Sequence, residues 1–250
     1  YLMAKGLGHD ADAGKYLERS GKWINMWNPD LESDGFRGFI DALNADGSFA
    51  SIDPKLYGGS WISPFYEAGS WTYSYYVPHD ISRLIELMGG PEEYVRRLMH
   101  AYENGLIEYT NEPAFLVTRT FSDAGHPDLC SYWTHEIMNN YYDLDGYPGN
   151  EDTGAMGSWY VFSAVGLFPN AGQDYYYLNA PKYAESVLDL GKGRKLTIRS
   201  DAAPGKVYIK SCKVGGKEWN KATITHEELV NAGLIEMELS DTPTGWAMTR

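Results

Sequence analysis

Three segments of the chain place acidic or amide side chains next to aromatic rings, and the first runs over residues 65–80. A single glutamate, Glu67, stands there among phenylalanine, tyrosine and tryptophan residues. Withdrawal from water favours the protonated form of a carboxyl group, so a glutamate buried among rings can donate a proton near neutral pH. The alternative interpretation is a surface glutamate beside aromatic residues of the core. Asp80, at the end of the segment, is interpreted as the cap of a following helix.

The second segment is the tripeptide Asn-Glu-Pro at 111–113. The proline favours an extended backbone at Glu112, which would hold its carboxylate in one orientation. Such a carboxylate can bind a hard cation or accept hydrogen bonds from sugar hydroxyls. A turn-forming Asn111 followed by a solvated Glu112 explains the same residues.

The third segment, residues 143–154, carries several carboxylates and leads directly into a helical pattern that contains Met156 and Trp159. Its last acidic residue, Asp152, would therefore lie at the N-terminus of a helix. A cap formed by Asp152 or Thr153, together with an acidic loop, is the alternative interpretation. The spacing of the acidic residues differs from that of an EF-hand calcium loop.

Glycosidic bond hydrolysis needs two carboxyl groups across one sugar ring, one protonated to donate to the leaving oxygen and one ionised to act as base or nucleophile. Glu67 and Asp152 supply such a pair in principle. Aromatic residues make up 14% of the chain, and their flat faces suit stacking against sugar rings. The net charge of −13 argues against nucleic acid as a partner, and the sequence has no apolar run as long as a membrane span.

The elements that must position these residues are helices in the first two thirds of the chain. Apolar residues at helical spacing predict helices over residues 10–27, 80–88, 91–102, 129–137 and 156–165, with glycines or prolines at their ends. Residues 36–66 show no clean period and are expected to form a long loop that lines a site.

After Pro169 the pattern changes to short runs of alternating apolar and polar residues, which predict half-buried strands around Leu196, Ile209 and Met237. The dipeptide Gly215-Gly216 predicts a two-residue hairpin turn. The sequence thus indicates a mainly α region followed by a small antiparallel β region, with a boundary near residues 170–180.

The chain resembles glycoside hydrolase family 92, the calcium-dependent exo-acting α-mannosidases. The resemblance covers nearly the whole chain, and it depends on the order and spacing of several motifs. They are Glu67 with Trp-Thr-Tyr at 71–73 and Val-Pro-His-Asp at 77–80, Asn-Glu-Pro at 111–113, Pro-Gly-Asn-Glu-Asp-Thr-Gly at 148–154, and the stretches 158–164, 166–169, 209–211 and 224–229.

The resemblance implies that residues 1–172 form the C-terminal part of an (α/α)6 catalytic barrel, and that residues 173–250 form an antiparallel β region closing the domain. Members of the family normally carry an N-terminal β-sandwich domain as well. This chain, which begins at Tyr1, has room for neither the sandwich nor all twelve barrel helices. It therefore looks like the C-terminal portion of a longer enzyme, whose missing β-sandwich is one expected partner.

The resemblance also implies roles for individual residues. Glu67 corresponds to the general acid, and Asp152 to the general base that activates water in an inverting reaction. Glu112 falls in the region that contacts the sugar and the Ca²⁺ ion, and is the candidate metal ligand. The other candidate substrate-binding residues are Asn111, Trp71, Asn150 and Glu151.

The expected substrate is a mannose-containing oligosaccharide or glycan, such as an N-glycan, and the expected location is periplasmic or extracellular, as in bacterial members. Two alternatives stay open. The chain could be a carbohydrate-binding fragment without turnover, or an (α/α)-barrel glycosidase of other sugar specificity.

Overall fold

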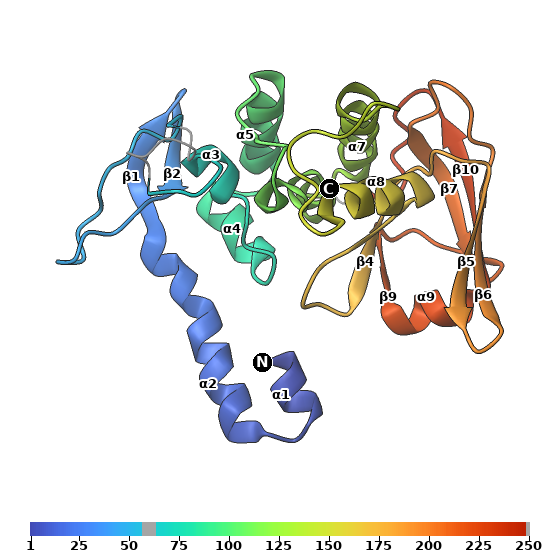
Figure 1. Cartoon of the computed structure of the whole chain (residues 1–250), viewed down its shortest axis with the longest axis horizontal. Helices are drawn as coiled ribbons and strands as arrows, with labels where there is room; N and C mark the ends of the chain where they lie inside the picture. Colours follow the sequence, from blue (N-terminus) through green and yellow to red (C-terminus); the bar gives the residue numbers. More distant parts are fainter. Residues whose placement is uncertain (57–63, 249–250) are drawn as a thin grey trace. The chain divides into compact units, whose positions relative to one another are not determined.

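The computed structural model describes residues 1–56 and 64–248 of the chain, which combine α-helices with β-strands (Figure 1). They form two compact units, residues 1–56 and 64–108 with 171–173, and residues 109–170 with 174–248. The domain boundary expected between residues 172 and 173 stays a prediction, as does the (α/α)6 barrel.

The first unit contains a helical arm, a hairpin and a group of helices. Its elements are α1 (Leu2–Gly6), α2 (Asp10–Ser20), the 3-10 helix η1 (Gly21–Met26), β1 (Trp27–Ser33), β2 (Phe36–Ile40), α3 (Ser70–Tyr73), α4 (Ile81–Leu87) and α5 (Pro91–Glu103). Figure 1 shows α1 and α2, in blue, extending away from the β1–β2 hairpin and from α3, α4 and α5.

The hairpin corrects the expectation of an irregular loop from residue 36 onward. Asp34 and Gly35 link β1 to β2 with φ angles of 51° and 80°. Two positive φ angles make the type I′ turn that suits a two-residue hairpin, and Asp-Gly is a preferred sequence for it. This dipeptide was therefore a signal for the missed strands. Residues 57–63 of the expected loop lie outside the described residues.

The helix expected over residues 10–27 ends earlier than the apolar spacing predicts. Its α-helical part stops at Ser20, a tighter 3-10 turn follows, and Trp27 is the first residue of β1. The Trp27 ring lies so close to Gly38 of β2 that a β-carbon there would come within 2.4 Å of it. Cross-strand packing of this ring therefore prevails over the local helical pattern.

The later helices of the first unit agree with the sequence analysis. Helix α4 follows Asp80, and Pro91 opens α5 after Gly89 and Gly90, whose φ angles of 100° and 94° suit only glycine. The buried face of α5 includes a charged residue, Arg97.

The second unit combines helices with two sheets. Its elements are the 3-10 helices η2 (Glu112–Ala114) and η3 (Val117–Arg119), helices α6 (Thr120–Asp123), α7 (Pro127–Tyr141), α8 (Ala155–Val165) and α9 (His226–Ala232), and strands β3 (Leu167–Pro169), β4 (Tyr175–Leu178), β5 (Glu185–Gly191), β6 (Arg194–Ser200), β7 (Tyr208–Val214), β8 (Lys217–Glu218), β9 (Thr223–Thr225) and β10 (Leu234–Ser240). The helices expected over 129–137 and 156–165 are confirmed, and Gly166 ends α8 with a φ angle of 88°.

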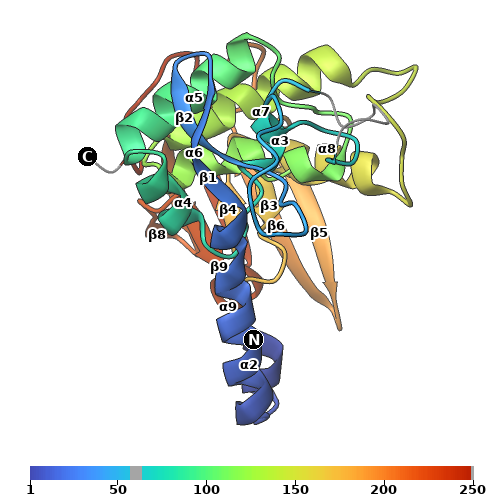
Figure 2. The same cartoon turned by 90° about the vertical axis from the view of Figure 1, so that its left-hand side faces the viewer.

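The strands form a three-stranded sheet in the order β3-β4-β9 and a five-stranded sheet in the order β5-β6-β10-β7-β8. Figures 1 and 2 show β5 and β6 as a long pair at one edge of the larger sheet. The hairpin turn at Gly215-Gly216 is confirmed between β7 and β8.

The larger sheet is mixed and not purely antiparallel as expected, because β10 pairs parallel to β6 and antiparallel to β7. A parallel neighbour cannot be reached through a tight turn. Helix α9 instead precedes β10, which enters between two strands formed earlier in the chain.

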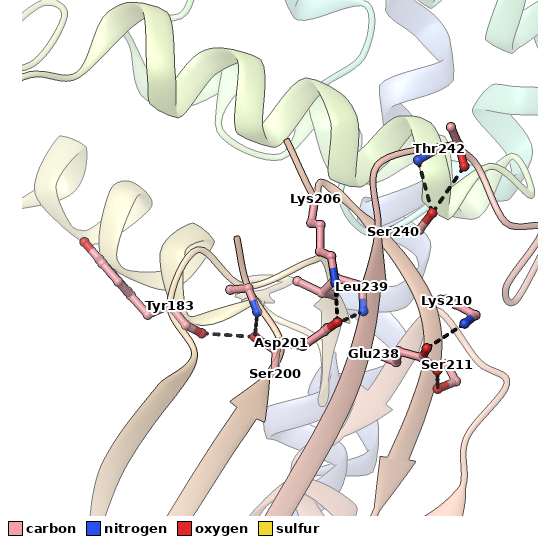
Figure 3. Close-up of polar contacts among 11 residues, drawn as sticks. Tyr183, Ser200, Asp201, Lys206, Lys210, Ser211, Glu238, Leu239, Ser240 and Thr242 are labelled. Carbon is pink, nitrogen blue, oxygen red and sulfur yellow. Dashed lines mark hydrogen bonds and ion pairs between the residues drawn. The ribbon is translucent and has the colours of Figure 1, made fainter. Parts of the chain in front are cut away.

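Polar contacts tie the ends of these strands to the segments beside them (Figure 3). The Asp201 carboxylate accepts a hydrogen bond from the backbone N–H of Leu239 at 2.7 Å and pairs with Lys206. The Ser200 hydroxyl donates to the backbone carbonyl of Tyr183 at 3.1 Å. The segment before β5 is thereby attached to the end of β6.

Candidate active site

Glu67, the candidate acid, lies in the first unit on the loop that leads into α3. Its side chain is half-buried, and its φ angle of 55° lies in the left-handed region. A residue other than glycine, asparagine or aspartate rarely adopts this conformation, which costs about 1–3 kcal/mol and persists where the surroundings impose it. Such residues cluster at functional sites.

Contacts on two sides hold the loop at the residues that follow Glu67. The Ser70 hydroxyl donates to the carbonyl of Ile40 on β2 at 2.5 Å. On the other side, a β-carbon on Gly69 would come within 2.9 Å of the Leu56 carbonyl oxygen, so the backbones are in close contact. The end of the loop, at Gly69 and Ser70, is therefore held between β2 and residues 54–56.

Trp71 has the position of a core side chain, although the sequence suggested that it binds substrate. It is 1% exposed, and its ring packs edge-on against Phe36 and Phe39, at centroid distances of 5.8 and 5.0 Å. Its Nε1–H donates to the Ser33 hydroxyl. Because its faces are covered, Trp71 supports the Glu67 loop in this structure and offers no open ring to a sugar.

Arg97 is a supporting residue that sequence reasoning missed. Its side chain is 1% exposed, lies 3.9 Å from the Phe39 ring centroid and 5.2 Å from that of Trp71, and donates to the Gly38 carbonyl at 2.7 Å. Burial lowers the pKa of this guanidinium, which the facing rings stabilise through cation–π contacts. The sequence feature that could have indicated its burial is its position in α5. It lies three residues after Tyr94 and one before Leu98, within the buried stripe of the helix.

The residue before α4 is Asp80, as expected, but its carboxylate does not cap the helix. It accepts a hydrogen bond from the indole N–H of Trp23 at 3.0 Å, and no hydrogen bond joins it to the first turn of α4. Asp80 thus attaches η1 to α4, a contact between residues 57 positions apart that the local sequence could not reveal.

The second and third motif segments come together in the second unit. A β-carbon on Gly149, whose φ angle is 71°, would lie 2.3 Å from the backbone oxygen of Thr110. The segment that begins with Asn111 and Glu112 is therefore in backbone contact with the segment that leads to Asp152. The indole N–H of Trp159 adds a second connection by donating to the Phe115 carbonyl at 3.0 Å.

This close contact predicts a specific requirement for glycine at position 149. We expect Gly149→Ala to lower the free energy of unfolding by roughly 2–4 kcal/mol, because it combines an unfavourable φ with a clash against backbone. Gly205 is a matched control, since its φ is 85° and no atom lies within 4 Å of an added β-carbon. Gly205→Ala should cost only about 1–2 kcal/mol in urea denaturation. Equal losses in the two variants would contradict the close contact.

Asn111 is 7% exposed and its side-chain oxygen accepts the backbone N–H of Glu112 at 2.9 Å. Asn111 is the extended residue, with φ −146° and ψ 154°, and Glu112 is the first residue of η2. The expectation of an extended Glu112 is therefore wrong, because the Asn111 cap and Pro113 start a 3-10 turn there. The Glu112 side chain is half-buried, while Asn150 is exposed.

The N-terminus of α8 is arranged differently from the expected cap by Asp152 or Thr153. Both residues have left-handed backbones, with φ angles of 44° and 63°, and Gly154 precedes the helix. The carboxylate of Glu151 takes the capping role by accepting the N–H of Gly157 at 3.2 and 3.3 Å. Asp152 is left exposed at the positive end of the helix dipole.

Arg119 is the second supporting residue that the sequence did not mark. It is fully buried and donates to the hydroxyls of Thr134 on α7, at 2.7 Å, and Ser163 on α8, at 2.6 Å. It also donates to the side-chain oxygen of Asn179 at 2.9 Å. These bonds fix α8, and with it the loop that carries Asp152.

The candidate residues thus fall into two sets, one in each unit. Glu67 and Trp71 belong to the first unit, and the other candidates, Asn111, Glu112, Asn150, Glu151 and Asp152, belong to the second. Among residues 1–56 and 64–248, no three His, Cys, Asp or Glu side chains gather closely enough to hold a metal ion. The same residues include no helix that is both long and apolar enough to cross a membrane.

Comparison with known proteins supports an assignment for this arrangement. A relative from the fungus Arthroderma benhamiae, named an uncharacterized secreted glycosidase, is 34% identical over 271 residues, which cover 98% of this chain and 34% of the relative. This chain therefore spans about a third of the length of that protein.

Two solved structures share the fold. The family GH92 inverting mannosidase of Bacteroides thetaiotaomicron VPI-5482 has a TM-score of 0.85 at 26% identity, over 98% of this chain and 36% of its own. A family GH92 α-mannosidase of Bacteroides thetaiotaomicron, solved with mannoimidazole, has a TM-score of 0.88 at 22% identity, over 98% of this chain and 35% of its own. The family described as the glycosyl hydrolase family 92 catalytic domain matches residues 1–241, and the chain belongs to this family.

Proposed function

We propose that the chain is the C-terminal portion of an exo-acting, inverting α-mannosidase that releases terminal mannose from glycans. The observation that carries this proposal is membership of glycosyl hydrolase family 92 over residues 1–241. The likeness to an inverting mannosidase at 26% identity supports both mannose as the released sugar and inversion at its anomeric carbon. The left-handed backbone of Glu67 adds physical support, because strained conformations cluster at functional sites.

In this proposal the protonated Glu67 carboxyl donates its proton to the glycosidic oxygen as the bond to the leaving group breaks. Asp152 removes a proton from a water molecule that attacks the anomeric carbon from the opposite face. Inverting glycosidases in general hold their two carboxyl groups roughly 6.5–9.5 Å apart, the separation that leaves room for the water. The residues that would border the sugar are Asn111, Glu112, Asn150 and Glu151. The Glu151 carboxylate already accepts a hydrogen bond from the N–H of Gly157.

A Ca²⁺ ion, which resemblance to the family implies, would bind sugar hydroxyls and favour the distorted ring of the transition state. The described residues fit this ion only in part. Glu112 offers one half-buried carboxylate, but the described part of the chain has no cluster of three acidic or histidine ligands around it. We therefore assign no step to calcium and propose Glu112 as one ligand among others supplied by backbone oxygens, water or the rest of the protein.

We further propose an extracellular or periplasmic location for the whole protein, and the name of the fungal relative supports its secretion. The relatives are about three times longer than this chain, so the remaining part of the protein is its first proposed partner.

The test is hydrolysis of α-mannosides by the full-length protein that contains this chain. We expect release of mannose whose first-formed anomer is β, observed by proton NMR before the anomers equilibrate. A chelator should abolish the release, and added Ca²⁺ should restore it. Release of α-mannose would contradict inversion, and cleavage of glucosides alone would indicate another sugar specificity. Binding of mannosides without release would indicate a carbohydrate-binding protein.

A further inference from the structure

We propose that a pocket of about 580 Å³ on the second unit, with four tyrosines among the ten residues that line it, binds sugar residues of the glycan beyond the terminal mannose. This inference rests on the proposed function, because it assigns a place to the remainder of the same substrate. The volume falls within the range of about 300–1,000 Å³ that is typical of ligand pockets.

The pocket includes a residue five positions after the candidate base in the chain. Gly157 lines it, and the N–H of Gly157 is the group that the Glu151 carboxylate accepts. Asp152 directly follows Glu151 in the chain. A glycan whose terminal sugar is held at Asp152 would therefore extend past the first turn of α8, where the pocket opens.

The rings in the pocket come from three separate parts of the second unit. Tyr142 and Tyr147 belong to the loop between α7 and α8, Tyr160 to α8, and Tyr183 to the segment before β5. Tyr147 and Tyr183 are 45% and 50% exposed, so each offers an open face. Such faces stack against the C–H surfaces of sugar rings, while the hydroxyls bind the sugar hydroxyls.

The walls are fixed before any ligand arrives. The Tyr142 ring stacks on Trp159, with centroids 5.6 Å apart and planes 12° apart, and also contacts Tyr160 at 5.3 Å. Burial and the charge of Glu151 raise the pKa of the Tyr142 hydroxyl, which therefore stays a hydrogen-bond donor. Preorganised walls reduce the entropy lost when a flexible glycan binds.

Hydrogen bonds also hold two irregular segments that line the pocket, the loop that contains Asp143 and the segment that contains Tyr183. The Asp143 carboxylate accepts the backbone N–H groups of Asp145 and Gly146 at 2.8 and 3.0 Å, which closes the loop on itself. Figure 3 shows the Tyr183 ring pointing away from the hydrogen bond that fixes its backbone carbonyl to Ser200. The anchored backbone thus leaves the ring available to the pocket.

The chemistry of the pocket favours a neutral saccharide over a charged ligand. Its rings and hydroxyls carry no charge, and the carboxylates of Asp143 and Asp145 at its rim would repel phosphate or sulfate. Carboxylates are, in contrast, good acceptors for sugar hydroxyls. Coverage of the same pocket by the rest of the protein is the competing possibility, and the test below separates the two.

The experiment uses the full-length protein and compares two substrates. Tyr147→Ala and Tyr183→Ala should each lower kcat/KM for linear α-mannotriose by about three- to tenfold, because each removes one stacking ring. Neither should change kcat/KM for α-mannosyl fluoride by more than about twofold, since that substrate has no group beyond the scissile bond large enough to reach the pocket. Tyr183→Phe keeps the ring and should retain most activity on mannotriose. Tyr16→Ala removes a tyrosine of similar exposure on α2, outside the pocket, and serves as the matched control.

Equal losses on both substrates, or no loss on either, would overturn the proposal. So would protection of Tyr147 and Tyr183 from tyrosine acetylation in the ligand-free protein, which would mean that other parts of the chain cover the pocket. Calorimetric titration of mannotriose keeps this test distinct from that of the proposed function. If the wild-type protein cleaves no mannoside, the proposed function fails. In that case, weaker binding of mannotriose by Tyr183→Ala than by Tyr16→Ala would still support a sugar pocket. Equal binding of mannotriose by the two variants would overturn it.

Discussion

Asp152→Asn should lower kcat/KM by about 10²–10⁴-fold on every substrate, whatever its leaving group, because an amide cannot take the proton of the attacking water. The fold should be preserved. Asp152 is exposed with a φ angle of 44°, and asparagine adopts the left-handed conformation as readily as aspartate. The measurement is initial-rate kinetics with an aryl mannoside and a disaccharide, accompanied by thermal unfolding.

Asp241→Asn is the matched control, since it neutralises an exposed carboxylate on the segment after β10. Its kcat/KM should equal that of the wild-type protein. A full rate in Asp152→Asn would show that another group acts as the base. A large fall in the unfolding temperature of Asp152→Asn would instead mean that its lower kcat/KM comes from disruption of the loop before α8.

Glu67→Gln should separate substrates by their leaving groups. On a disaccharide, whose leaving alkoxide needs a proton, kcat/KM should fall by about 10²–10⁴-fold. On a dinitrophenyl mannoside, whose leaving group departs without protonation, the fall should be less than about tenfold. Glutamine keeps the size of the side chain, and the contacts of Ser70 and Gly69 that hold the loop involve neighbouring residues.

The matched control for this prediction is Glu92→Gln, which neutralises an exposed glutamate in the first turn of α5. It should leave the ratio of the two rates unchanged. An equal loss on both substrates in Glu67→Gln would mean that Glu67 binds or positions the sugar and does not protonate the leaving oxygen.

The parts of the fold that the sequence predicted depend on neighbouring residues. The apolar spacing of α4 and α8, the proline that opens α5 and the glycine pair between β7 and β8 each act within a few positions of the chain. Asp34-Gly35 belongs to the same class, so the β1–β2 hairpin could have been predicted as well. The place of β10 between β6 and β7 could not, because alternation identifies a strand without identifying its partners.

For the candidate site, the sequence by itself determined the motif residues, the family to which they belong and hence the proposed chemistry of Glu67 and Asp152. Only the tertiary structure decided that Trp71 is enclosed by Phe36 and Phe39 and that the Glu151 carboxylate is bound to Gly157. The same holds for the buried side chain of Arg119, and for the pocket that joins Tyr142 to Tyr183. The physical reason is that residue type and spacing fix what a side chain can do, whereas burial and hydrogen-bond partners come from residues far away in the chain.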